Sequence, residues 1–409
     1  MANSVKQLTA ILLIILILFT TACWSKSEID ELAFIMVIAI DRAEDGNYLV
    51  SFKIAKPRAQ IKGGDKDGGS QGKQFLVFGF KVANISEAAV SLYKALDKAP
   101  FFGQTRDVII SEEVAKQGIN PILDHLSRFY RLRRNILLFI AKGKALDVIE
   151  TKISGTPVPG LNFAARIDNS NENNLTEEIT VGNFLSKLAA DKIQPIVPGI
   201  RRVSNRDPEI AIMETEEIAI DKIAVFKGDR LLGWLNDDET RGYMLTTNKG
   251  SRSWITVPFE TDSQFVYLLK QTKMSKKIEM ENGLPTIKLK FTADAVLMEV
   301  NEPVGHEHTP SNWPANMPEM EALASEKVRS DINQAVAKAQ EFNSDIFGFG
   351  QLVYREKPEV WRGLESHWNE EIFPNLRVSV DAEIKVKRSG STVSPPYTPK
   401  EERNLPVVE

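Results

Sequence analysis

The stretch IEMENGLPTIKLKFTADAVLME, residues 278–299, decides the fold of the C-terminal third of this chain. Asn282-Gly283 is a two-residue hairpin turn, and apolar and polar residues alternate on both sides of it. Successive side chains of a strand point to opposite faces, so the second arm has one apolar face. That face carries Ile287, Leu289, Phe291, Ala293, Ala295 and Leu297. The pattern predicts a hairpin with one face against a core.

Two predicted helices and a final strand follow the hairpin. Residues 319–342 place apolar side chains at the 3.6-residue period of a helix, and residues 359–372 do the same over a shorter stretch. Residues 376–388 alternate as a strand. We therefore expect an α+β domain over 273–388, with helices packed on one face of a largely antiparallel sheet. The proline-rich, charged tail over 389–409 is predicted to be disordered.

Strands and helices alternate in the first half of the chain. Strands are predicted over 34–40 and 48–55, joined by an Asp-Gly turn at 45–46. The first strand is apolar almost throughout, so we expect it to be buried on both faces. A helix is predicted over 85–96, with Pro100 beyond its end. This alternation indicates a mixed α/β domain.

Polar residues around Pro208 interrupt the pattern and suggest a domain boundary. We therefore expect an N-terminal mixed α/β domain over 23–205 and a middle domain over 206–272. Two short strands of the middle domain are joined by the turn at 227–229. With the C-terminal domain, the chain is predicted to hold three mixed α/β domains.

The composition is that of an ordinary globular protein. The chain has 409 residues, of which 43% are hydrophobic and 26% charged, and its formal net charge is -4. These values favour two or three folded domains. A nucleic-acid binder normally concentrates basic residues on one surface, so the acidic balance argues against nucleic acid as a partner.

The first 22 residues have the layout of a secretory signal peptide. Lys6 precedes an unbroken apolar run over 10–19, and the small residues 20–22 follow. Ten apolar residues rise only about 15 Å as a helix, roughly half the hydrocarbon thickness of a bilayer. We therefore expect residues 1–22 to be a signal peptide, although stretching the run to 5–22 leaves an uncleaved anchor as the alternative.

Cys23 is the only cysteine, so it cannot form an intramolecular disulfide. The small residues before it are similar to a bacterial lipobox, in which the cysteine sulfur receives a diacylglyceryl group. Thr20 stands where leucine is usual. Two or more acyl chains hold a protein stably at a membrane. We predict that Cys23 is the lipid attachment site; the alternative is a secreted protein whose cysteine is incidental.

Three patterns suggest catalysis or metal binding and fail on their context. Residues 68–72 match G-x-S-x-G, but a glycine-rich loop precedes them instead of a strand. His306-Glu307-His308 lacks the i, i+4 helical spacing of a zinc motif and lies between prolines. The adjacent acids 237–239 are expected to be exposed in a turn. We predict no enzyme: no catalytic residue, no metal site and no cofactor.

Four arginines gather after a predicted helix in the first half. These are Arg128, Arg131, Arg133 and Arg134. Cations suit the C-terminal end of a helix, so a solvated helix end is the ordinary interpretation. Contact with lipid head groups is the alternative.

Four stretches together resemble the Ger(x)C family of spore germination lipoproteins, the C subunits of GerA-type nutrient germinant receptors. They are CWSKSEIDELAFIMVIAIDR (23–42), RDVIISEEVAKQGINPILDHLSR (106–128), AVFKGDRLLGWLNDDETRGYML (224–245) and DIFGFGQLVYREKPEVWRGLESHWNEEIFPNLRVSVDAEIKVKRSG (345–390). The resemblance covers nearly the whole chain after the signal peptide. Where members commonly have Cys-Trp-Asp, this chain has Ser25 after Trp24.

The resemblance implies a three-domain lipoprotein on the outer face of a spore's inner membrane. It implies two integral membrane subunits of the same receptor as partners, and a function in germination through protein contacts with them. Small-molecule recognition in such receptors is generally assigned to the membrane subunits. The alternative is a solute-binding lipoprotein that captures a nutrient itself, although the sequence shows no repeat of two similar lobes. A cell-wall hydrolase is a third class, and no motif supports it.

Only Cys23 carries over as a functional position. The third stretch contains a motif whose residues are Gly233, Trp234, Leu235, Glu239, Thr240, Arg241 and Gly242. We expect these residues to be structural: glycines for turns, tryptophan for the core, and Glu239 with Arg241 as a buried pair. A surface for a partner is the alternative. Gly348 and Gly350 are expected at the exit from the long helix.

Overall fold

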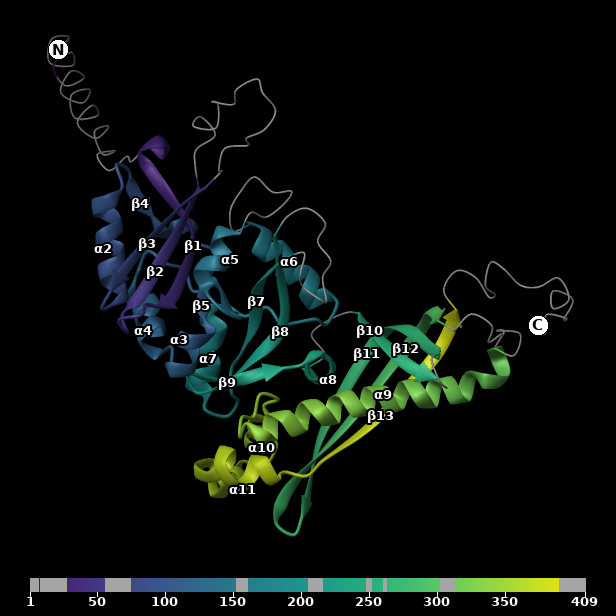
Figure 1. Cartoon of the computed structure of the whole chain (residues 1–409). Coiled ribbons are helices and arrows are strands. Elements are labelled where there is room, and N and C mark those ends of the chain that lie inside the picture. The colour runs from purple at the N-terminus through teal and green to yellow at the C-terminus, as the bar shows by residue number, and fades with distance from the viewer. Residues whose placement is uncertain are drawn as a thin grey trace, which may run out of the picture.

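The computed structural model describes Gln7 and residues 28–55, 75–151, 161–204, 216–247, 252–259, 263–301 and 313–389. Two β-sheets dominate the described part of the chain (Figure 1). Cys23, the 68–72 motif, the 306–308 triplet and the tail from residue 390 lie outside the described residues.

The first sheet has nine strands in the order β3-β2-β1-β5-β6-β7-β8-β9, and β4 pairs with β1. Its strands are β1 Leu32–Arg42, β2 Tyr48–Ala55, β3 Phe75–Val82, β4 Ala99–Phe101, β5 Asp107–Ser111, β6 Leu137–Ala141, β7 Ile196–Val203, β8 Glu217–Lys227 and β9 Arg230–Leu235. The central strands β1, β5, β6 and β7 run parallel. Antiparallel strands extend the sheet on both sides, so it is mixed, as expected.

Helices cover both faces of this sheet. They are α2 Ile85–Ala95, α3 Glu112–Gln117, α4 Asn120–Arg128, α5 Ala145–Glu150, α6 Leu161–Glu172 and α7 Val181–Ala190. Ile38 and Ile40 of β1 share a core cluster with α2, α3, α4 and α7. Val37 and Ala39 share the opposite cluster with α5 and α6. The prediction that the first strand is buried on both faces is therefore confirmed.

The second sheet has four strands in the order β10-β11-β12-β13. They are β10 Ser253–Phe259, β11 Ser263–Glu281, β12 Leu284–Asn301 and β13 Val378–Ser389. The first three pair antiparallel, and β13 runs parallel to β12. The predicted apolar face of β12 is buried in full, and α9 Trp313–Glu341 packs over the sheet. The helix-on-sheet arrangement expected for this region is confirmed.

The expected middle domain contributes to both sheets. Its strand β8 pairs with β7 of the first sheet and β9 pairs with β8, whereas β10 and β11 belong to the second sheet. Between them lies the remaining helix of this region, α8 Asp237–Thr247. The division of the chain into three domains at 205 and 272 stays a prediction.

The single helix predicted over 359–372 is broken. The structure has α10 Phe349–Glu356 and α11 Pro358–Leu364, followed by the short 3-10 and π turns Glu365–His367, Trp368–Ile372 and Phe373–Asn375. Pro358 starts α11 because proline fits the first turn of a helix, where no main-chain donor is needed. Helix α10 was not predicted from the sequence.

The glycines of the fourth stretch do not end the long helix, so that expectation was wrong. The left-handed residue after α9 is Asn343, with φ 48°. Gly348, with φ 67°, precedes α10 instead. A Cβ on Gly350 would lie 2.8 Å from Trp368 Nε1 and 3.0 Å from the ring of Trp361, so this glycine admits two tryptophans.

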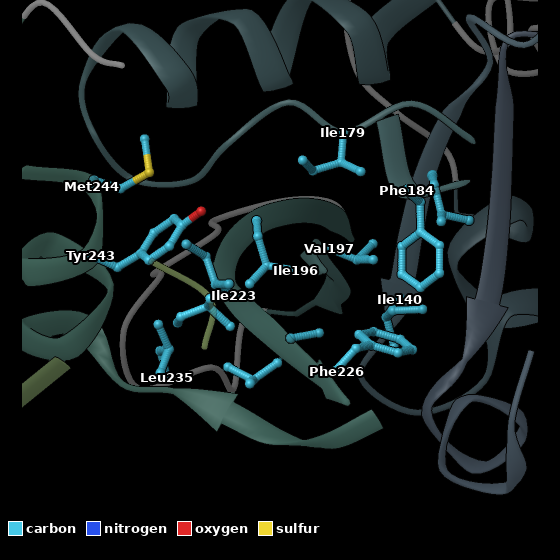
Figure 2. Close-up of a cluster of buried hydrophobic side chains, with 14 of the residues drawn as sticks. Ile140, Ile179, Phe184, Ile196, Val197, Ile223, Phe226, Leu235, Tyr243 and Met244 are labelled. Carbon is cyan, nitrogen blue, oxygen red and sulfur yellow. The ribbon is translucent and has the colours of Figure 1, made fainter. Parts of the chain in front are cut away.

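The main core passes from the first sheet into α8 (Figure 2). Ile140 of β6, Phe184 of α7 and Phe226 of β8 lie at one end of the cluster in the figure, and Tyr243 and Met244 of α8 lie at the other. All five are buried. Because α8 also packs on α9, this continuous core joins the two sheets.

Candidate functional site

The sequence motif 233–242 lies at the junction of the two sheets. Gly233, Trp234 and Leu235 end β9, the last strand of the first sheet. Thr240, Arg241 and Gly242 belong to α8, which packs on α9 over the second sheet (Figure 1). Leu235 and Thr240 are buried, and Trp234 is half-buried against the core. The structure therefore brings the motif together at this junction.

Glu239 caps α8 and does not pair with Arg241, so that prediction was wrong. Its main-chain N–H donates to Asn236 Oδ1 at 2.9 Å. In return, the N–H of Asn236 donates to Glu239 Oε2 at 2.7 Å. This reciprocal pair satisfies two main-chain donors at the helix start, and an acid there also suits the helix dipole.

The motif glycines Gly233 and Gly242 permit close packing and do not form turns. The expectation that these glycines serve turns was therefore wrong. A Cβ on Gly242 would lie 2.0 Å from the main-chain oxygen of Asp331 in α9. A Cβ on Gly233 would lie 2.6 Å from the ring of Phe342. Main-chain atoms cannot rotate away as a side chain can, so Gly242 fixes the approach of α8 to α9.

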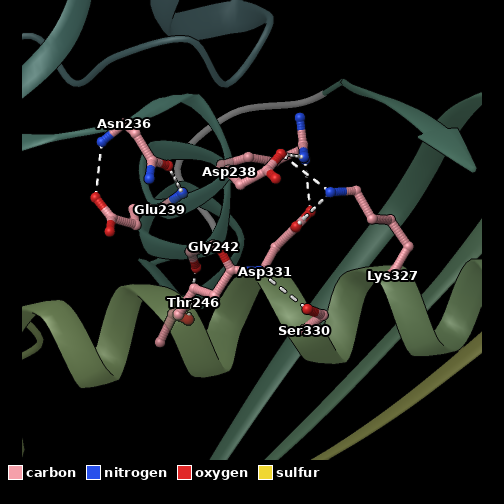
Figure 3. Close-up of polar contacts among 10 residues, drawn as sticks. Asn236, Asp238, Glu239, Gly242, Thr246, Lys327, Ser330 and Asp331 are labelled. Atoms are coloured by element: carbon pink, nitrogen blue, oxygen red, sulfur yellow. Dashed lines mark hydrogen bonds and ion pairs between the residues drawn. The ribbon is translucent and has the colours of Figure 1, made fainter.

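Four charged side chains form a network between α8 and α9 (Figure 3). Arg241 Nε donates to Asp331 Oδ2 at 2.7 Å, and Arg241 also pairs with Asp238. Lys327 Nζ lies 2.9 Å from Asp331 Oδ1 and 3.0 Å from Asp238 Oδ1. Two cations and two carboxylates thus alternate, and each charge faces its opposite.

Burial makes the pairing within this network necessary, because a buried charge needs a partner. The side chain of Asp331 is 0% exposed and that of Arg241 is 18% exposed. Burial favours the neutral acid at Asp238, but Lys327 and Arg241 outweigh it, so the pKa of Asp238 lies below its usual value. Burial disfavours the charged guanidinium of Arg241, but Asp331 outweighs it and the pKa of Arg241 is raised.

The opposite side of α8 binds to the first sheet's helix layer. The hydroxyl of Tyr243 donates to Glu177 Oε2 at 2.8 Å, and Lys187 Nζ of α7 lies 3.7 Å from Glu177 Oε1. Tyr243 and Glu177 are both buried. Burial, with the adjacent carboxylate, raises the pKa of Tyr243 well above its usual value. Tyr243 therefore remains a neutral hydrogen-bond donor.

A second connection between the sheets follows α9. Ser344 Oγ donates to the main-chain oxygen of Phe226 in β8 at 2.6 Å. The next residue, Asp345, is 0% exposed. Its carboxylate accepts from the N–H groups of Phe349 and Gly350 at 3.0 and 2.6 Å, and from Trp368 Nε1 at 3.0 Å. Asp345 therefore holds the start of α10 against the following turn.

This arrangement fixes the two sheets relative to one another. Its cations are paired with carboxylates, and the Tyr243 hydroxyl and the Trp368 indole N–H donate to the buried carboxylates of Glu177 and Asp345. No group of three or more His, Cys, Asp or Glu that could hold a metal occurs within the part of the chain that the structure describes. The acids 237–239 open α8, where Asp238 and Glu239 have the structural partners given above.

Sequence reasoning missed the partners of the motif, although one signal was present. Asp331 interrupts the apolar stripe of α9 beside Val328 and Ile332, all of them buried. A buried acid in such a stripe requires a partner for its charge, from its own helix or from another element. The pairing with Arg241, 90 residues earlier, depends on tertiary structure and has no local signature.

No helix among residues that the structure describes is long and apolar enough to cross a membrane. Cys23, the predicted lipid attachment site, lies outside the residues that the structure describes.

Comparison with known proteins finds one family. Residues 25–202 match the model for a spore germination protein N-terminal domain, and residues 221–390 match the spore germination B3/GerAC-like C-terminal model. Spore germination protein KC of Bacillus subtilis is 27% identical, over 95% of this chain and 97% of its own length. Spore germination protein B3 of the same organism is 22% identical, over 92% and 96%.

A solved structure has the same fold. The crystal structure of the GerBC protein aligns with a TM-score of 0.54 and 17% identity, over 85% of this chain and 96% of that one. At this identity the likeness concerns the fold alone. The two family matches together extend over both sheets and the junction between them. The chain belongs to the GerAC-like family of spore germination proteins.

Proposed function

We propose that this protein is the lipid-anchored C subunit of a spore nutrient germinant receptor. In this proposal Cys23 carries the lipid, and the folded body lies on the outer face of the spore's inner membrane. It acts through contacts with two integral membrane subunits of the receptor and catalyses no reaction.

The observation that carries the proposal is where the family match begins. The N-terminal domain match starts at residue 25, two residues after Cys23. The only thiol of the chain therefore stands shortly before the family match, and three small residues separate it from the apolar run over 10–19. A diacylated cysteine at this position would tether the body, because two acyl chains bind a membrane stably.

The junction of the sheets supports a function through contacts. Arg241 and Gly242 hold α8 against α9, and Tyr243 holds it against Glu177, in the segment that leads into α7. A subunit that bridges the bilayer and its partners needs such a rigid connection. Interior packing is dense and transmits strain in this way.

Replacement of the thiol tests the proposal. In spores that carry the native chain, we expect the mature amino terminus to be a diacylated Cys23 by mass spectrometry, and the protein to copurify with two membrane proteins. With Cys23→Ser, we expect the protein to leave the membrane fraction and nutrient germination to slow. A native chain with a free thiol in the soluble fraction would overturn the tether. Normal germination of deletion spores with every nutrient would overturn the function.

Direct capture of a nutrient is the second candidate, because an open hollow with polar groups lies on the surface between α2 and α4. A cavity of about 570 Å³ lies between α2 and α4. Tyr48, Asn84, Ser86, His125 and Arg128 contribute polar groups to its lining. Calorimetry of the mature chain with amino acids and sugars separates the candidates, since micromolar binding that Ser86→Ala weakens would favour direct capture.

A further inference from the structure

Two exposed tyrosines and an arginine contact one another on the surface of the first sheet's helix layer. Arg131 Nη1 donates to the hydroxyl of Tyr93 at 2.5 Å, and Arg131 Nε donates to the hydroxyl of Tyr130 at 3.1 Å. Tyr93 and Tyr130 are 44% and 82% exposed. Arg133 and Arg134 follow in the same loop between α4 and β6 and are exposed. We name these five residues the arginine–tyrosine patch.

The positive charge of the patch is not neutralised. Arg131, Arg133 and Arg134 form no ion pair with any residue in the described ranges, whereas the neighbouring Arg128 pairs with Asp124 at 2.8 Å. The chain as a whole is acidic, with a formal net charge of -4. Arg131 with its two phenol rings therefore forms the centre of a cationic and aromatic surface on an acidic protein, and Arg134 lies three residues further along the exposed loop. Arg133 also lines a hollow with the acids Asp168 and Glu178, so its charge is partly offset.

The patch lies at the end of the sheet where the described chain begins. The first residues of β1 pair with β4, through Leu32 with Ala99. Helix α2 ends at Ala95, shortly before β4, and Tyr93 is in its last turn. The hydrogen bond to Tyr93 holds Arg131 at the same end. Asp30 and Glu31 lie where the chain enters β1, and their negative charge repels anions there. The attraction for anions is therefore limited to the side of this end that α2 and α4 cover.

The length of chain between Cys23 and the described body limits where a bilayer can be. Glu28, the first residue of the continuous described chain, is five residues after Cys23. Five extended residues span at most about 18 Å. If Cys23 carries acyl chains, as in the function proposed above, Glu28 stays within roughly this distance of the membrane, and the patch lies at the end of the sheet where the chain from Glu28 enters it.

We propose that the arginine–tyrosine patch docks on the anionic head groups of the bilayer to which Cys23 is tethered. This inference rests on the proposed function. Guanidinium groups bind phosphate oxygens through paired N–H donors, and tyrosine rings favour the interface between head groups and acyl chains. The tether keeps the patch at a high effective concentration near the surface, so weak individual contacts are sufficient. Docking fixes the orientation of the body, which attachment at a single point cannot do.

Vesicle binding without the lipid tests the patch independently of the tether. The mature chain from residue 23, with Cys23→Ser, is mixed with vesicles of phosphatidylcholine alone or of phosphatidylcholine with phosphatidylglycerol. We expect binding only to the anionic vesicles, with loss at high salt. Each arginine near an anionic surface contributes about a fivefold factor. The triple variant Arg131→Gln, Arg133→Gln, Arg134→Gln should therefore bind roughly a hundredfold more weakly.

A matched variant removes the same charge elsewhere. Arg355, Arg362 and Arg377 are also exposed, and their triple change to Gln should alter binding by no more than about twofold. Circular dichroism confirms that both triple variants fold. Equal losses in both triples, or no binding of the parent chain to anionic vesicles, would overturn the patch; the arginines would then be available to a protein partner. Mass spectrometry of native Cys23 tests the tether separately, so the two failures are distinguishable.

Discussion

Gly242 of α8 lies directly against the main-chain carbonyl of Asp331 in α9, and a Cβ on Gly242 would lie 2.0 Å from that oxygen. This contact sets the distance between α8, which packs into the core of the first sheet, and α9, which covers the second sheet. Because both partners are main chain, neither can adjust without moving a whole helix. The position of one sheet against the other therefore depends on the absence of a single methyl group.

Gly242→Ala should destabilise the protein. Overpacking of this kind typically costs about 3 kcal/mol, more than the about 1 kcal/mol by which alanine favours a helix over glycine. Urea denaturation of the mature chain measures the change. Gly363→Ala in α11 is the control, because no atom lies within 4 Å of its would-be Cβ. Stability of Gly242→Ala equal to that of the control would show that α8 and α9 separate readily.

Removal of one partner from the buried ion network should destabilise the protein more than removal of both partners of an ion pair. Asp331→Asn leaves Arg241 and Lys327 without their shared carboxylate, and we expect a loss of about 3 kcal/mol. In the double variant with Arg241→Met, less charge is left uncompensated, and part of the lost stability should be regained. A double-mutant cycle by urea denaturation measures the coupling.

An exposed pair serves as the comparison for this network. Arg362 and Glu359 are 70% and 79% exposed, and Arg362→Ala should leave the midpoint of unfolding unchanged. Additive effects of Asp331→Asn and Arg241→Met would contradict a shared network.

The local elements of this fold follow from sequence, and their pairing does not. The alternation on either side of Asn282-Gly283 depends on neighbouring residues, so the hairpin and the buried face of β12 were predicted correctly. The cap between Asn236 and Glu239 also has a local signature, an Asn with a Glu three residues later, and was overlooked. The partner of Arg241 could not be found in this way, because the two chain segments meet only in the folded state.

Helix breaks were the other limit of sequence reasoning. Trp361 and Trp368 were assigned to one continuous helix from their spacing. In the structure they lie in α11 and in a π turn, 5.2 Å apart between ring centroids. Their position depends on Gly350, which leaves space for both rings, and on Asp345, which accepts the Trp368 N–H. Periodicity alone does not distinguish such a chain path from a regular helix.

Tyr243→Phe should weaken the contact between α8 and the first sheet's helix layer. The change removes the hydroxyl that donates to Glu177 Oε2, one of the partners of this buried carboxylate. Loss of a buried hydrogen bond to a charged group typically costs about 1–3 kcal/mol. Thermal unfolding measures the loss. Tyr354→Phe is the control, since Tyr354 is half exposed, and an equal loss there would mean that the Glu177 contact is not special.

A buried lysine should make stability depend on alkaline pH. Lys53 of β2 and Asp107 of β5 flank Val37 of β1 in one row across the first sheet, and both are buried. Burial lowers the pKa of Lys53 from 10.5 to about 8, against the opposing effect of Asp107. Between these values the unfolded chain binds a proton that the folded chain does not. Stability should therefore rise as the pH increases from about 8 to 10.5.

Replacement of both buried charges tests this dependence. Burial also raises the pKa of Asp107 well above its usual value, so a lysine-only variant would leave an uncompensated acid. The double variant Lys53→Met, Asp107→Leu removes both penalties. At neutral pH it should be more stable than the native chain by about 3 kcal/mol, the equivalent of the lysine's shift, because apolar pairs often replace buried charges favourably. The gain should shrink as the pH rises toward 10.5. A stability difference that stays constant over this range, measured by urea denaturation at each pH, would show that Lys53 remains charged in the folded state.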